Sequence, residues 1–131
     1  MSFATLGVVE ERDLARRLAI GRIAIGTSAL LTSKLFALVF AGREGAEDRL
    51  ARIAGRLFGI REIVLGLLTI DALDQKQPAK RLVQLGMMCD VSDFLAILMG
   101  AGVLPWRGRI LGLGLAGGFA AIDAKVLPAL D

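Results

Sequence analysis

Charged residues stand inside stretches of this chain that are otherwise as apolar as membrane spans. Arg61 and Glu62 lie within ARIAGRLFGIREIVLGLLTI, and Asp90 and Asp93 lie within LVQLGMMCDVSDFLAILMGAG. A charge at bilayer depth costs free energy, so it is kept only where it is paired, hydrated or used. The pattern indicates a buried ionic network as the candidate site.

Each apolar stretch also carries small residues at helical spacing, with a charged residue among them. Because small residues let helix backbones approach closely, we expect these charges to face neighbouring helices and not lipid. The predicted network consists of Arg22, Arg61, Glu62, Asp90, Asp93 and Asp123. The predicted helix-packing residues are Gly26, Gly55, Gly59, Gly66, Gly86, Gly100 and Gly112.

The charges in this predicted network do not balance. Near the centres of their stretches, Arg22 and Arg61 meet the carboxylates of Glu62, Asp90 and Asp93. Arginine stays protonated in proteins, so we expect either a protonated carboxyl group or a further bound cation. Asp90 and Asp93 lie three residues apart on one helix face and are the pair expected to share a proton. The network either fixes the pairing of the helices, or serves as a proton relay, a cation site or a headgroup pocket.

The elements that must position these charges are long apolar helices. The chain has 131 residues, of which 55% are hydrophobic, and this exceeds the apolar content of ordinary soluble domains. We expect one integral-membrane domain over residues 1–131, an all-α, transmembrane, up-down-up-down four-helix bundle. The predicted spans cover about residues 14–31, 50–70, 81–103 and 109–127. A soluble four-helix bundle with an apolar surface is the alternative.

The connections between the spans refine this expectation. The segment KLFALVF after the first span is too short to cross a bilayer and suits an interfacial or re-entrant element. Short links and an even number of spans place both termini on one side, and we expect that side to be the cytoplasm. Trp106 suits the headgroup region, and Arg49, Arg52 and Arg56 form a basic ridge for lipid headgroups or a partner.

Several classes of function are excluded or disfavoured by composition. The chain has no histidine and a single cysteine, Cys89, so we expect no metal site, no cofactor and no catalytic residues. The run GLGLAG, residues 112–117, matches a dinucleotide fingerprint by letter, but it lies within an apolar helix and is interpreted as packing. No basic face with stacking aromatics is visible, so we expect no nucleic-acid partner.

The chain resembles small four-helix bacterial integral-membrane proteins of the actinobacterial type, broadly DoxX-like. The resemblance rests on RLAIGRIAIGTSALL, GRLFGIREIVLGLL and CDVSDFLAIL, which contain G-R, R-E and D-x-x-D in successive spans. It implies the four-helix membrane fold and a bacterial inner-membrane location. It also implies that Arg22, Arg61, Glu62, Asp90 and Asp93 are signature positions. DoxX-type proteins sit in membrane complexes tied to redox chemistry, but this chain lacks redox residues.

The function expected from the sequence is therefore that of an accessory or structural subunit of a larger membrane complex, not an enzyme. Membrane lipids and protein partners, or further copies of the chain, are the expected neighbours. The alternative is a small transporter or a lipid- or ion-binding membrane protein that works through the charged cluster. An enzyme acting on lipid substrates, supported only by paired carboxylates, ranks last.

Overall fold

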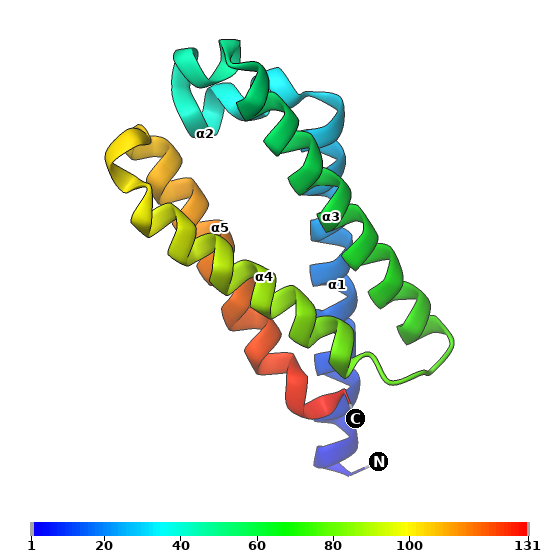
Figure 1. The fold of residues 1–131 in the computed structure, drawn as a ribbon. Coiled ribbons are helices and arrows are strands. Elements are labelled where there is room, and N and C mark those ends of the chain that lie inside the picture. Colours follow the sequence, from blue (N-terminus) through cyan, green and yellow to red (C-terminus); the bar gives the residue numbers. More distant parts are fainter. Residues whose placement is uncertain (1, 131) are drawn as a thin grey trace.

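The protein is all-helical throughout the part of the chain that the structure describes, residues 2–130, with the side chains of residues 3, 4 and 101 excepted. The structure is a computed structural model, and Figure 1 shows its helices in chain order. The α-helices are α1 (Phe3–Leu31), α2 (Ser33–Glu47), α3 (Arg49–Asp74), α4 (Lys80–Met99) and α5 (Trp106–Val126). Short 3-10 turns follow α4 at Ala101–Val103 and α5 at Leu127–Ala129.

Polar side chains mark where the first helices begin and end. The hydroxyl of Ser2 accepts a hydrogen bond from the backbone N–H of Thr5, so α1 begins well before the span predicted from residue 14. Thr32 breaks the helical backbone after α1, and α2 leaves at 86° to it. The carboxylate of Asp48 accepts from the N–H of Leu50 and starts α3. The segment expected at the interface is thus a 15-residue helix, bent at Gly42.

Two helical layers make up the molecule. In Figure 1, α1 and α3 lie side by side and run in opposite directions, and α4 and α5 form a second hairpin beside them. The layers meet near the end that carries both chain termini and separate toward the other end, which α2 covers. The splayed arrangement therefore leaves the contact between layers concentrated in the lower half of the bundle.

Glycines bring α1 and α3 into backbone contact. A Cβ atom added to Gly59 would lie 2.5 Å from the carbonyl oxygen of Gly26, and one added to Gly26 would lie 2.5 Å from that of Gly59. A Cβ on Gly66 would lie 2.6 Å from the carbonyl oxygen of Ala19. Because backbone atoms cannot move aside cheaply, these positions admit only glycine at the observed helix separation.

A small apolar core holds the two layers together at the terminal end. Ala15 from α1, Ala72 and Leu73 from α3, Val83 from α4 and Val126 from α5 are all buried in it. Burial of such side chains is worth about 25 cal/mol per Å² of apolar surface. This core fixes the lower end of the bundle and sets the depth at which side chains higher in each helix meet.

Two helices are long and apolar enough to cross a membrane, namely α4 and the segment Trp106–Ala129 that contains α5. The bent pair formed by α1 and α2 passes the same test together and would be a third span. Helix α3 carries too many charged residues to pass by composition, among them Arg52, Arg56 and Arg61. By length and composition the structure thus contains two candidate spans, or three.

Two glycine-to-alanine variants, one outside the contact of α1 with α3 and one within it, test this close approach. Gly21→Ala is expected to raise the free energy of unfolding by about 0.5–1 kcal/mol, because alanine favours helix and, apart from the neighbouring backbone of α1, no atom of the described chain lies within 4 Å of the new Cβ. Gly59→Ala brings the same helix preference but is expected to lower the free energy of unfolding by about 1–2 kcal/mol through overpacking. Unfolding in mild detergent, followed by circular dichroism, measures both; stabilisation by Gly59→Ala would contradict the packing described.

Candidate functional site

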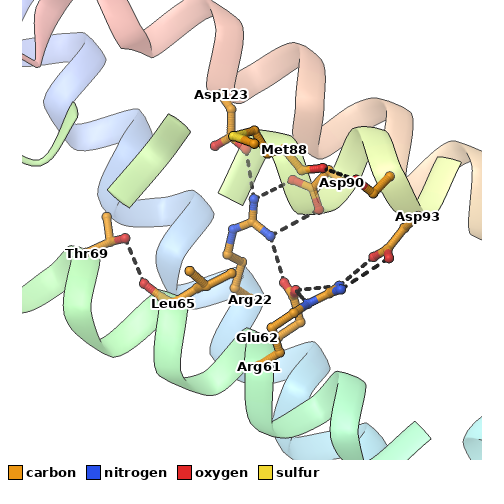
Figure 2. A network of polar contacts seen from close by, with 10 residues as sticks. Arg22, Arg61, Glu62, Leu65, Thr69, Met88, Asp90, Asp93 and Asp123 are labelled. Atoms are coloured by element: carbon orange, nitrogen blue, oxygen red, sulfur yellow. Dashed lines mark hydrogen bonds and ion pairs between the residues drawn. The ribbon is translucent and has the colours of Figure 1, made fainter. Parts of the chain in front are cut away.

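The guanidinium group of Arg22 joins all four long helices halfway along the bundle (Figure 2). From α1 it donates hydrogen bonds to Glu62 on α3 at 2.7 Å, to Asp90 on α4 at 2.5 and 3.2 Å, and to Asp123 on α5 at 2.8 Å. The Arg22 side chain is 4% exposed, and the three carboxylates are 1–4% exposed. Such charge-assisted bonds in a dry setting are strong but demand complete pairing.

Glu62 links Arg22 to a second arginine. One oxygen of its carboxylate accepts from Arg22, and the other accepts from Nη2 of Arg61 at 3.1 Å. Arg61 in turn donates two hydrogen bonds to Asp93, at 2.5 and 3.2 Å. The Arg61 and Asp93 side chains are 33% and 29% exposed, so this outer pair lies at the edge of the network. The six residues therefore form one continuous network that leads from the interior toward the surface.

Aromatic rings cover both guanidinium groups. The Cζ atom of Arg22 lies 5.1 Å from the ring centroid of Phe119, and that of Arg61 lies 5.1 Å from the ring centroid of Phe58. A phenyl face attracts a cation, and the attraction is larger where water is excluded. No buried side-chain nitrogen or oxygen within the described part of the chain lacks a hydrogen-bond partner. The network is thus satisfied by hydrogen bonds, although its formal charges do not balance.

The carboxylates pair differently from the sequence expectation. Asp90 and Asp93 were the pair expected to share a proton, but Asp90 binds Arg22 and Asp93 binds Arg61. The two carboxylates that meet are those of Asp90 and Asp123, which both accept from Nη2 of Arg22. The physical reason is helix position: the terminal core sets the depth of α5 so that Asp123 faces Arg22 across the layers.

Five of the seven predicted packing glycines lie where another helix approaches closely. Gly26, Gly59 and Gly66 lie at the α1–α3 contact described above. A Cβ on Gly86 would lie 2.9 Å from Nη2 of Arg22, and one on Gly112 would lie 2.7 Å from the side chain of Ile97, so these glycines also serve close contacts.

Two predicted packing glycines have looser surroundings. A Cβ on Gly55 would make only ordinary contact with Phe36, at 3.4 Å. Gly100 ends α4, and its added Cβ would lie near the carbonyl of Ala96 in its own helix, at 3.3 Å. Gly100 therefore acts at a helix end and not between helices. Gly108, which shares the small-residue face and a G-x-x-x-G motif with Gly112, makes the closest approach, with its Cβ position overlapping the carbonyl of Phe40 in α2.

A cleft of about 380 Å³ borders the ionic network, and residues of both layers and of α2 line it. Glu62, Asp90 and Asp93 form its charged end. The remainder of its wall is alanine, glycine and larger apolar side chains, with four phenyl rings. These rings belong to Phe36, Phe40, Phe58 and Phe119. Concave, mainly apolar spaces with a few convergent polar groups are the usual form of small-ligand sites.

The predicted headgroup residues gather at the end of the molecule that α2 covers. Arg49 and Arg56 are exposed, Arg52 is half-buried, and the three occupy the first turns of α3. Trp106 is 65% exposed at the start of α5, with Arg107 over its ring. These four residues are not part of the ionic network. An exposed tryptophan and arginines at one end of apolar helices suit a headgroup layer.

The network is not arranged to hold a metal ion. Within residues 2–130, no group of three or more acidic, cysteine or histidine side chains has the geometry of a metal site. Cys89 is a free thiol, half-buried on α4. What the arrangement can do is bind helices together and present negative charge to the cleft. The aromatic wall was missed by sequence reasoning, although the i, i+4 spacing of Phe36 and Phe40 was a visible signal.

Fold and site together define an all-helical protein with a buried arginine–carboxylate network between two layers. Comparison of the chain with models of protein families, with curated proteins and with solved structures found no match.

The role of Arg22 in holding the layers together can be tested by comparing its loss with the loss of Arg17, an exposed arginine on the same helix. Arg22→Leu leaves buried carboxylates without their cation, and we expect a loss of on the order of 3–5 kcal/mol in the free energy of unfolding. Arg17→Leu removes an exposed i, i+4 pair with Asp13, whose loss is expected to cost about 0.5 kcal/mol. Reversible unfolding in detergent measures both variants. Equal losses would show that the Arg22 network does not hold the layers together.

Proposed function

We propose that this chain is a small integral-membrane protein that binds a mainly apolar ligand in the cleft between its helical layers. The single observation that carries the proposal is the lining of the cleft, to which both layers contribute and whose charged end is made by Glu62, Asp90 and Asp93 of the ionic network. A bundle that used the network only for helix pairing would gain from closing the layers above it, because filled interiors gain dispersion contacts. Of the functions expected from sequence, this geometry favours binding through the charged cluster.

The membrane setting is supported by the outer surface of α3, the helix that composition alone does not mark as a span. The exposed large residues along its middle are all aliphatic, and they are Leu57, Ile60, Val64, Leu67 and Leu68. Its central charges, Arg61 and Glu62, turn toward the network instead. Apolar outside and charged inside is the pattern of a membrane bundle. We therefore propose four spans, with α2 as a bent cap at one surface.

The location follows from this proposal together with the resemblance to DoxX-like proteins. We place the chain in a bacterial inner membrane with both termini in the cytoplasm. The ridge of Arg49, Arg52 and Arg56 and the ring of Trp106 would then meet the headgroups of the opposite leaflet. We propose that the chain belongs to that family. The resemblance implies the four-helix fold but no particular reaction.

A second candidate function, that of an accessory subunit, is favoured by one observation on α5. Gly114 and Gly118 form a G-x-x-x-G pair that is exposed, and apart from the neighbouring backbone of α5 no atom of the described chain lies within 4 Å of a Cβ added to either. This pair is free to receive a helix of a partner protein or of a second copy. Stoichiometric partners in mild-detergent extracts, lost on Gly118→Leu, would support this role; recovery of the chain alone would count against it.

Ligand binding in the cleft is testable by photolabelling with a small neutral aryl diazirine. We expect adducts on cleft residues such as Phe36 and Phe58 in detergent-solubilised protein. Ala54→Phe, at an exposed position on the cleft wall, should reduce these adducts about tenfold by filling the space. Ala24→Phe, at an exposed position of α1 outside the lining, should leave them unchanged. Mass spectrometry of peptides gives the yields, and equal labelling in all three proteins would contradict the proposal.

A further inference from the structure

The ionic network carries more negative than positive charge. Its cations are Arg22 and Arg61, and its carboxylates are those of Glu62, Asp90, Asp93 and Asp123. Two guanidinium groups against four carboxylates leave a formal excess of two negative charges when all are ionised. An uncompensated charge at membrane depth is costly, so either protons or a bound cation must offset the excess.

The excess is presented to the cleft. The charged residues among the described lining are Glu62, Asp90 and Asp93, and all three are acidic, whereas neither arginine belongs to the lining. Asp93 is the carboxylate that a ligand reaches, because its side chain is 29% exposed while those of Glu62 and Asp90 are at most 4% exposed. The cleft therefore combines an acidic end with an otherwise apolar wall.

The rest of the wall selects the kind of cation. The rings of Phe36 and Phe40 have centroids 4.5 Å apart, and those of Phe36 and Phe58 are 5.6 Å apart, so they form one aromatic surface. Phenyl faces attract weakly hydrated organic cations, whereas a small inorganic cation would lose its hydration shell against apolar groups. An apolar body is also needed to fill a cleft of about 380 Å³.

We propose that the cleft binds a lipophilic organic cation, an onium ion or a protonated amine carrying a bulky apolar body. The charge rests beside Asp93, and the apolar body lies among the phenyl rings and alanines of α2, α3 and α5. This inference rests on the proposed function, because it specifies the ligand of the same cleft. Charge complementarity favours a cationic ligand, because a neutral or anionic ligand of equal shape would leave the negative charge at the acidic end without a positive partner.

The test uses two ions of nearly the same size and shape and opposite charge, tetraphenylphosphonium and tetraphenylborate. Each is added as a competitor to the neutral aryl diazirine, with the full chain in uncharged maltoside detergent. We expect tetraphenylphosphonium to protect cleft residues at a concentration at least about tenfold lower than tetraphenylborate does.

Two variants change this protection in opposite directions. Asp93→Asn should weaken protection by tetraphenylphosphonium about tenfold, because it removes the reachable negative charge. Arg61→Gln should strengthen it, because it removes the cation that competes for Asp93. Asp71→Asn, an exposed carboxylate on α3 outside the lining, is the matched control and should leave it unchanged.

The possible results separate this inference from the function on which it rests. Equal protection by the two ions, stronger protection by tetraphenylborate, or an unchanged result for both Asp93→Asn and Arg61→Gln would overturn the cation while leaving the cleft as a binding site. Labelling of the cleft that neither ion reduces would also overturn it. Absence of any cleft-specific labelling in the unaltered protein would overturn the proposed function itself.

Discussion

The structure depends on one guanidinium group. Arg22 is the point where the α1–α3 layer meets the α4–α5 layer, and it binds a carboxylate from each of the other three long helices. The glycines around it follow from this requirement. Gly86 leaves room for the guanidinium group against α4, and Gly26 with Gly59 brings α1 close enough to α3 for Arg22 to reach Glu62. A side chain at any of these positions would displace a helix or the arginine.

A buried ion pair adds little net stability when compared with well-packed apolar side chains, and it is costly to break. Its usefulness here lies in specificity: Arg22 is buried, and the carboxylates of α3, α4 and α5 are the partners it binds, so the two layers have one register. The same constraint explains why the layers can diverge above the network. Between the apolar core at the terminal end and the contact of α5 with α2 at Gly108 and Phe40, the network aligns the helices at mid-length, and a cleft can remain open under α2.

The sequence predicted helices, the small-residue faces and the set of charged residues that the structure brings together, because all of these follow from helical periodicity and the cost of charge in apolar surroundings. It did not predict the pairing. Asp90 and Asp93 share a face of α4, yet they bind different arginines, because pairing depends on the relative depth of helices set by the terminal core. Nor did it predict the extent of α1, whose capping residue Ser2 precedes the apolar run. The sequence also did not predict the cleft, because a space between layers arises from tertiary packing around Phe36, Phe58 and Phe119.

The most direct test of this account is a double-mutant cycle between Arg22 and Asp123, the two residues that join the first helix to the last. Unfolding free energies in bicelles are measured for Arg22→Gln, Asp123→Asn and the double variant. The account predicts a coupling energy of about 1–3 kcal/mol, with the double variant less damaged than the sum of the single ones. Additive losses would show that the two side chains do not interact in the folded protein, and the Arg22-centred network would then be wrong.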